Sequence, residues 1–305
     1  MKVNFLASCV LALSLLAPAT GTAAAGTTRS FDVGALRVER LSDKGPAVIL
    51  IPGLASGPWV WEDTAKRLAS RHSVYLLTLP GFDGRAAVAG ATFDTLVRDL
   101  GNLIATRHLD RPVLIGHSLG GSLSLIYATT WSATIRGVVA VDGLPVFPGT
   151  ERMPGDRSAL GAQARAQFAG QSVEQFAAGQ RAYMARIGVL DEALATRLAE
   201  RSSRSDMAAT GDFMAQALEL DLRPKLGDIE VPVVEISPFN APDFAAMGVD
   251  EAGKTAYYRG LLAGVEKLEV VSISPARHFV MFDQPEKFAA ALDAALTNMF
   301  ESKQK

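Results

Sequence analysis

One short segment constrains this chain more than any other. Residues 116–120 read GHSLG and stand between an apolar run at 113–115 and a segment at 119–129 whose composition suits a helix. Glycines two positions before and after a serine let neighbouring backbone pack against a sharp strand-to-helix turn, which presents the serine hydroxyl at the carboxyl end of the strand. The pattern therefore predicts Ser118 as a nucleophile.

The rest of the first half alternates between strand-like and helix-like segments. Fully apolar runs are typical of strands buried on both faces of a parallel sheet. Strands that alternate with helices predict an α/β fold with helices on both faces of the sheet. The expected strands are one or two antiparallel strands within 30–41, then 47–51, 73–79, 113–115 and 135–141, and the expected helices are 61–70 and 93–107.

Residues 150–218 change in character. They are rich in Ala, Gln, Arg, Glu and Met, without β-branched runs, and helical patterns cover 157–170, 172–187, 191–201 and 205–219. The strand pattern resumes at 231–236 and 267–272, and a closing helix is expected at 286–300. The sequence thus predicts a core made of residues 26–149 and 219–305, interrupted by a helical insertion at 150–218.

The N-terminal residues 1–25 have the pattern of a signal peptide. Lys2 precedes a mostly apolar stretch at 3–17, and Ala23-Ala24-Ala25 supplies the small residues that a signal peptidase accepts. A retained membrane anchor is the alternative, although the apolar stretch is short for a bilayer span. We expect an exported protein, periplasmic or secreted.

Composition narrows the chemistry further. Cys9 is the single cysteine and lies in the signal segment, so the mature chain is expected to contain no disulfide, thiol nucleophile or cysteine metal site. The net charge is −2, without a basic stripe, which argues against nucleic-acid partners. Beyond the signal segment, no apolar run is long enough to span a membrane.

Four segments in this order carry a family resemblance: 51–54 (IPGL), 79–82 (LPGF), 116–120 (GHSLG) and 277–279 (RHF). Together they resemble the α/β-hydrolase superfamily, in the branch that has a helical cap. The resemblance implies a mostly parallel sheet of the eight-stranded type with helices on both faces and an inserted cap. It also implies a serine hydrolase that uses no cofactor.

A nucleophilic serine needs a general base, and the sequence offers four histidines. His72 and His108 precede strands and belong to the opposite end of the sheet from Ser118. His117 lies inside the turn, and its side chain is expected to point away from the nucleophile. His278 follows the last strand, at the same end as Ser118, so elimination favours His278 as the base.

The acid partner has two candidates. The resemblance places it after the strand before the histidine strand, where Asp243 is the first carboxylate of the loop 237–243 and gives the chain order Ser-Asp-His. This loop carries two prolines and its aspartate comes late, which departs from the family pattern. Asp142, directly after the strand at 135–141, is the alternative acid, because some family members place it there. Asp243 is the favoured choice.

The developing oxyanion of acyl transfer needs hydrogen-bond donors. One is expected from the backbone N–H of Leu119, at the start of the helix after the nucleophile. The resemblance places the second at the N–H of Leu54, after the first parallel strand, where Gly53 permits a close backbone approach.

These residues predict a serine hydrolase that cleaves an ester-type bond in a small, apolar molecule through an acyl-enzyme. A carboxylic ester is the default substrate, with a lactone or thioester as further options. A perhydrolase or C–C hydrolase variant of the same site and a non-catalytic scaffold that binds a small ligand are the alternatives. Dehalogenase and epoxide-hydrolase chemistry is disfavoured, because such members carry an aspartate where this chain has Ser118.

Overall fold

The computed structural model describes residues 29–153 and 156–301; the predicted signal segment at 1–25 lies outside them. Within this part, eight strands form one sheet in the order β1-β2-β4-β3-β5-β6-β7-β8. The β1–β2 and β2–β4 pairs are antiparallel and all other pairs are parallel. The strands are β1 (Arg29–Val33), β2 (Leu36–Arg40), β3 (Ala47–Ile51), β4 (Ser73–Thr78), β5 (Val113–His117), β6 (Gly137–Val141), β7 (Val233–Pro238) and β8 (Leu268–Ile273).

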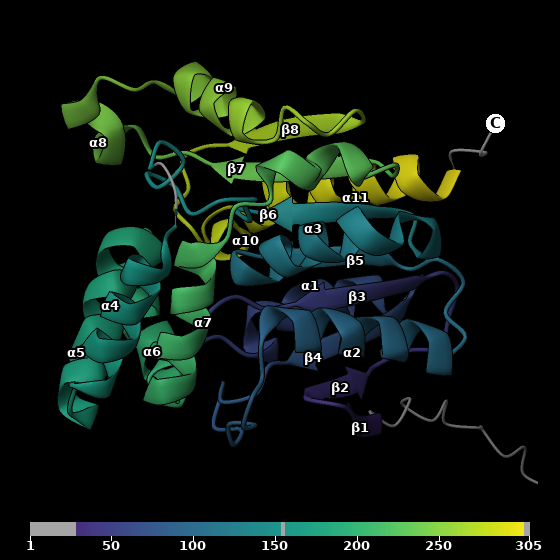
Figure 1. Cartoon of the computed structure of the whole chain (residues 1–305). Helices are drawn as coiled ribbons and strands as arrows, with labels where there is room; N and C mark the ends of the chain where they lie inside the picture. Colours follow the sequence, from purple (N-terminus) through teal and green to yellow (C-terminus); the bar gives the residue numbers. More distant parts are fainter. Residues whose placement is uncertain (1–28, 154–155, 302–305) are drawn as a thin grey trace, which may run out of the picture.

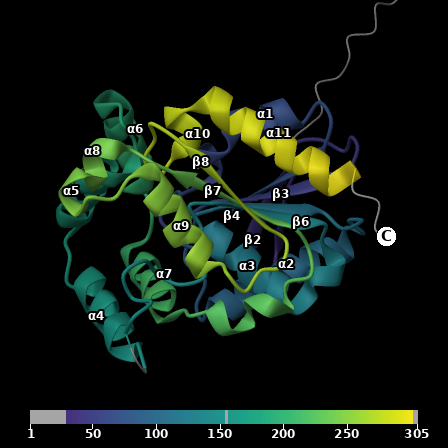
Figure 2. The same cartoon turned by 90° about the horizontal axis from the view of Figure 1, so that it is seen from above.

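Helices cover both faces of this sheet, as Figures 1 and 2 show. The alternation of side chains along β3 explains why: Ile49 and Ile51 enter one apolar core, whereas Val48 and Leu50 enter the other. The first core packs under α2 (Phe93–Thr106), α3 (Leu119–Trp131) and α9 (Glu251–Leu261), and the second under α1 (Glu62–Leu68), α10 (Val280–Asp283) and α11 (Pro285–Glu301). The predicted fold class is confirmed.

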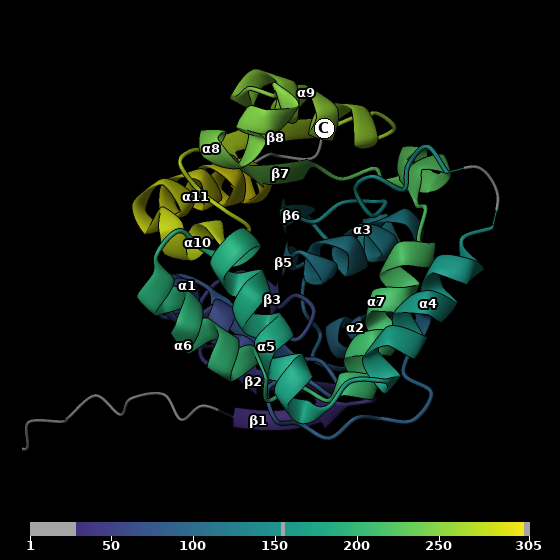
Figure 3. The same cartoon turned by 90° about the vertical axis from the view of Figure 1, so that its left-hand side faces the viewer.

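Four further helices lie between β6 and β7, at the carboxyl end of the parallel strands (Figures 1 and 3). They are α4 (Ser158–Ala169), α5 (Val173–Tyr183), α6 (Glu192–Ser202) and α7 (Met207–Glu219), and a π-helical turn, η3 (Met184–Gly188), follows α5. The helices pack in two pairs, α4 with α7 and α5 with α6. We call α4 to α7 with η3 the cap.

A second insertion lies between β7 and β8, where the sequence analysis named only the loop 237–243. It contains α8 (Ala241–Phe244), the 3₁₀ turn η5 (Ala245–Met247) and α9, and α9 packs against β8. Asp250 begins α9 by accepting a hydrogen bond from the N–H of Gly253. The remaining 3₁₀ turns are η1 (Pro58–Val60), η2 (Ser132–Thr134) and η4 (Arg223–Asp228). Among the described helices, none combines the length and apolar character that crossing a bilayer requires.

Candidate active site

Ser118 occupies the turn between β5 and α3 that its sequence predicts. Its φ of 52° and ψ of −118° are unusual for a residue other than glycine. The turn is tight: a Cβ at Gly116 would lie 2.1 Å from the Gly120 carbonyl oxygen, and a Cβ at Gly120 would lie 2.3 Å from that of Ile51. Both positions therefore require glycine, and the tight turn between them places Ser118 directly after the end of β5.

Sheet register brings Ser118 and Asp142 together. His117 of β5 pairs with Val141 of β6, so each of the two residues is the first beyond this pair. The N–H of Ser118 donates to the Val141 carbonyl at 2.8 Å, and the N–H of Asp142 donates to the Ile236 carbonyl at 3.0 Å. Asp142 also has a positive φ, of 50°, which turns the chain sharply at the sheet edge.

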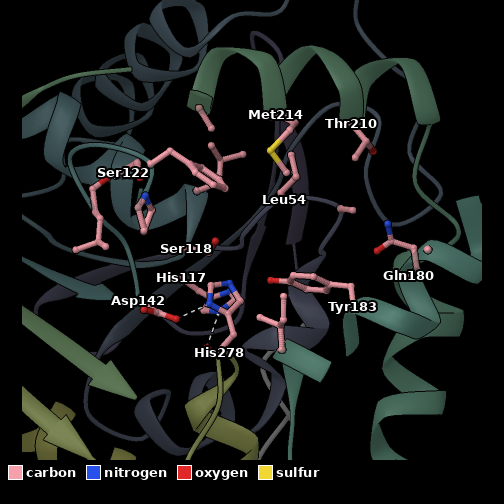
Figure 4. Close-up of a pocket in the computed structure, with 18 of the residues that line it drawn as sticks. Leu54, His117, Ser118, Ser122, Asp142, Gln180, Tyr183, Thr210, Met214 and His278 are labelled. Atoms are coloured by element: carbon pink, nitrogen blue, oxygen red, sulfur yellow. Dashed lines mark hydrogen bonds and ion pairs between the residues drawn. The ribbon is translucent and has the colours of Figure 1, made fainter. Parts of the chain in front are cut away.

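His278 faces Asp142 across this edge (Figure 4). Its Nδ1 lies 2.5 Å from Asp142 Oδ2, and the hydroxyl of Tyr258 donates to the other carboxylate oxygen, Oδ1. Nδ1 must carry a proton to bond a carboxylate, which leaves Nε2 available as a base. Ser118, Asp142 and His278 line the same cavity.

The Asp142 carboxyl is ionised although it is buried. Burial alone would raise its pKa, but nearby His278 and Lys254, with the hydrogen bonds from His278 and Tyr258, bring that pKa below its usual value. Lys254 lies in α9 with its Nζ 4.9 Å from the centre of the Tyr258 ring, and it donates to the Pro238 carbonyl. The insertion between β7 and β8 thus supplies two residues that stabilise the negative charge of Asp142.

The prediction that Asp243 lies beside His278 is wrong. Asp243 belongs to α8, and its two carboxylate oxygens accept hydrogen bonds of 2.8 Å from Nε and Nη2 of Arg277. A short helix begins three residues past the end of β7, and it carries Asp243 onto the arginine next to the expected base. The alternative acid, Asp142, is the carboxylate that contacts His278.

His72 and His117 have partners other than Asp142. His72 stacks on Phe300 and contacts the Pro46 carbonyl, at the opposite end of the sheet as expected. His117 does not point away from the site: its ring centre is 4.5 Å from that of His278, and its Nε2 donates to the His278 carbonyl at 3.1 Å. Burial and the neighbouring His278 hold the pKa of His117 well below its usual value, so this ring is a neutral support beneath the histidine loop.

The two expected oxyanion donors lie next to Ser118. Leu119 is the first residue of α3, where an N–H has no acceptor within the helix. Leu54 follows Gly53, and a Cβ at Gly53 would lie 3.0 Å from the Ser118 Cβ, so this loop runs directly against Ser118. Leu54 and Leu119 line the cavity together with Ser118. The arrangement fits stabilisation of a tetrahedral oxyanion by two backbone amides.

The model of one protein family, described as the alpha/beta hydrolase family, matches residues 48–291. The chain belongs to the alpha/beta hydrolase family. This match covers the sheet from β3 onward, the cap, and both loops that meet at Ser118 and His278.

Curated relatives of this alpha/beta hydrolase include esterases. The chain is 29% identical over 204 residues to the pimeloyl-[acyl-carrier protein] methyl ester esterase of Aeromonas hydrophila, covering 65% of this chain and 78% of the relative. It is 33% identical over 125 residues to the carbendazim hydrolyzing esterase of a Nocardioides species, covering 40% of this chain and 52% of the relative. Among solved structures, the enol-lactonase from Burkholderia xenovorans superposes with a TM-score of 0.72 at 18% identity, covering 88% of this chain and 100% of that one.

The cavity above Ser118 has a volume of about 520 Å³ and lies between the sheet edge and the cap. Apolar side chains from both parts line it, among them Leu54, Leu144, Phe168, Phe176 and Met214. Its polar lining away from Ser118, Asp142 and the histidines is uncharged and includes Gln167, Gln171, Gln180 and Thr210. No lysine, arginine or glutamate of the described residues contributes to it. Such a cavity favours a neutral, mainly apolar ligand.

A buried glutamate stands one strand away from Asp142. Glu235 of β7 pairs with Ala140 of β6 and is completely buried. Burial and the carboxylate of Asp142 raise the pKa of Glu235 well above its usual value, against a smaller opposite effect of Lys254 and the Gly143 amide. The raised pKa favours the protonated form of Glu235, whereas the lowered pKa of Asp142 favours its carboxylate.

Sequence reasoning missed three residues of the site, namely Tyr183, Lys254 and Tyr258. The start of α9 does carry a signal, since Asp250 is a favourable N-cap residue before a run of good helix formers. Nothing in the spacing of the cap helices indicates that Tyr183 faces the cavity. Among the described residues, no group of three or more His, Cys, Asp or Glu side chains is arranged to hold a metal ion.

Proposed function

We propose that this alpha/beta hydrolase is a serine esterase that cleaves neutral, mainly apolar carboxylic esters. The contact between His278 Nδ1 and Asp142 Oδ2 carries the proposal, because it gives the histidine behind Ser118 both a fixed tautomer and a counter-charge. The esterase relatives from Aeromonas and Nocardioides support the reaction class. The uncharged lining of the cavity supports the substrate class.

The mechanism follows from this geometry. Ser118 Oγ attacks the ester carbonyl while His278 Nε2 accepts its proton, and Asp142 stabilises the imidazolium that forms. The amides of Leu54 and Leu119 donate to the oxyanion. His278 then gives the proton to the leaving alcohol, and the acyl group remains on Ser118. Water, deprotonated by His278, releases the acid and regenerates the serine.

A fluorophosphonate probe tests the nucleophile. The wild-type protein is expected to be labelled at Ser118 and to hydrolyse p-nitrophenyl butyrate, whereas Ser118→Ala should fail in both assays. Ser122→Ala is the matched control: its hydroxyl also lines the cavity, but it donates to the Leu144 carbonyl at 2.7 Å. A folded wild-type protein that is neither labelled nor active would favour a binding scaffold over an enzyme.

The substrate class has a separate test. Wild-type kcat/KM for p-nitrophenyl butyrate should exceed that for the p-nitrophenyl monoester of succinic acid by about 10-fold or more, since the lining offers the free carboxylate no cation. Equal values for the two esters would contradict a site for neutral substrates.

We also propose export through the segment 1–25, on the basis of its charge and apolar pattern. N-terminal sequencing of the protein from an expressing bacterial culture should find a start near residue 26. An N-terminus at Met1 would contradict cleavage.

A further inference from the structure

Tyr183 is a cavity residue to which the mechanism above gives no role. It ends α5 in the cap, and its hydroxyl is directed toward His278 and Ser118 in Figure 4. The Tyr183 ring meets the imidazole of His278 edge to face, with 6.1 Å between ring centres. Within residues 29–153 and 156–301, its hydroxyl has no hydrogen-bond partner. Tyr258 also lines the cavity, but its hydroxyl donates a hydrogen bond to Asp142.

The position of Tyr183 relative to His278 is fixed by backbone contacts. The π-helical turn η3, which starts at the next residue, accepts hydrogen bonds from the histidine loop. The N–H of His278 donates to the Ile187 carbonyl at 3.1 Å, and the N–H of Phe279 donates to the Gly188 carbonyl at 2.9 Å. Arg277 adds a bond of 2.9 Å to the Ala185 carbonyl. These hydrogen bonds therefore hold Tyr183 and His278 next to each other, although the two residues are 95 residues apart in the chain.

The location of this hydroxyl decides which substrate atom it meets. The oxyanion donors, Leu54 and Leu119, belong to the loop after β3 and the start of α3. The Tyr183 hydroxyl lies next to His278 (Figure 4). In a Ser-His mechanism the leaving-group oxygen lies beside the histidine, because the histidine protonates it.

We propose that the Tyr183 hydroxyl donates a hydrogen bond to the leaving-group oxygen of the ester, which makes it a catalytic residue of the acylation step. This inference rests on the proposed esterase function. When the tetrahedral intermediate collapses, the bond between the carbonyl carbon and the leaving oxygen breaks, and its electron pair goes to that oxygen. His278 Nε2 transfers its proton to the oxygen, and Tyr183 keeps its own proton while it stabilises the developing negative charge.

The protonation state of Tyr183 suits this role. Burial and the charge of Asp142 raise the pKa of the phenol, so the hydroxyl keeps its proton at the pH values where esterases are assayed. A donor that never ionises stabilises negative charge on the leaving oxygen without competing with His278 as a base.

The test compares leaving groups at a constant acyl group. Values of kcat/KM, which report acylation, are measured for p-nitrophenyl, phenyl and ethyl butyrate with the wild type and Tyr183→Phe. The variant should lose about 10-fold or more on ethyl butyrate and less than about 2-fold on p-nitrophenyl butyrate, because a weakly basic leaving group needs little stabilisation. A plot of log kcat/KM against leaving-group pKa should therefore be steeper for the variant.

Tyr127→Phe is the matched control. It removes the same atom from a hydroxyl that contacts Thr134 on the far side of α3, and it should leave the three values unchanged. Equal losses on all three esters, or no loss on any, would overturn the leaving-group role of Tyr183. Failure of the esterase proposal is recognised separately, because a wild-type protein that hydrolyses none of the three and resists fluorophosphonate labelling lacks the activity itself.

Discussion

Two neighbouring loops at the carboxyl edge of the sheet each carry an aspartate, and the structure uses them differently. Asp142 follows β6 without an intervening residue and is buried against His278, Tyr258 and Lys254. Asp243 lies five residues beyond β7, in a short helix, with 30% of its side chain exposed. Its partner is Arg277, the residue before the base in the sequence.

The difference shows that strand register decides which carboxylate reaches His278. Val141 pairs with His117 on one side and with Ile236 on the other, so the residue after it is fixed from both directions. The chain after β7 has no such constraint, because the last two residues of β7 are paired with β8 alone before the chain enters an insertion. A carboxylate at the end of a central strand is thus positioned by the sheet, whereas Asp243 is positioned by its own ion pair.

The largest expected effect comes from replacing the Asp142 carboxylate by an amide, with the same exchange at Asp243 as the comparison. Asp142→Asn should lower kcat on p-nitrophenyl butyrate by about 10³–10⁴-fold, because an amide neither fixes the proton-bearing nitrogen of His278 nor stabilises its charge. Asp243→Asn should change kcat by less than about 3-fold. The opposite order, measured on folded variants with equal circular dichroism, would restore Asp243 as the acid.

A smaller effect is expected for Tyr258, whose hydroxyl donates to Asp142. Tyr258→Phe removes one charge-assisted hydrogen bond and should lower kcat by about 3- to 10-fold with little change in KM. Tyr257→Phe, at the adjacent and more exposed tyrosine, should have no such effect. In an Asp142→Asn background, Tyr258→Phe should cost almost nothing further. A full effect there would show that Tyr258 acts through other residues.

The pH dependence of thermal stability in a Glu235 variant tests the charge balance around Asp142. Its raised pKa means that the folded state keeps a proton that the unfolded chain loses above about pH 4.3. Wild-type stability should therefore fall as pH rises from that value toward the raised pKa, and Glu235→Gln should remove this loss. Thermal unfolding should give the variant a Tm a few degrees above wild type at pH 8 and an equal Tm near pH 4. A variant that is less stable at pH 8 would show that the glutamate is ionised in the fold.

The smallest effect concerns the surface ion pair of Asp243. The Arg277 hydrogen bonds lower the pKa of this carboxyl, against the effect of partial burial, so its stabilisation exists above the unfolded pKa of about 3.9 and disappears as pH falls through the lowered value. Asp243→Asn should reduce the free energy of unfolding by at most about 1 kcal/mol at pH 7, because the pair is partly exposed. The difference from wild type should vanish near pH 2, as measured by urea titration. A difference that persists there would point to packing instead of charge.

The same contrast explains how much the sequence predicts. The turn at Ser118 is local, because its glycines, the preceding strand and the following helix all lie within residues 113–131. His278 follows from topology, since the carboxyl ends of parallel strands share one edge. Asp142 and Asp243 both follow a strand at that edge, and only the pairing of β6 with both neighbours separates them.

The residues that support the site are less accessible to sequence reasoning. Tyr258 reaches Asp142 from an insertion, and Tyr183 reaches His278 from the cap, so both contacts depend on how whole helices pack over the sheet edge. Helical periodicity identifies the apolar face of such a helix but does not specify which cavity that face meets.

The bonds between η3 and the histidine loop limit how this enzyme can admit its substrate. If the α5 edge of the cap swung outward, the carbonyls of Ile187 and Gly188 would leave the amides of His278 and Phe279, or would pull the base away from Asp142. The α5 edge of the cap must therefore be closed in a molecule that is ready to react. Substrate must therefore reach Ser118 by a route that leaves these hydrogen bonds intact, so the α5 edge is the fixed side of the cavity.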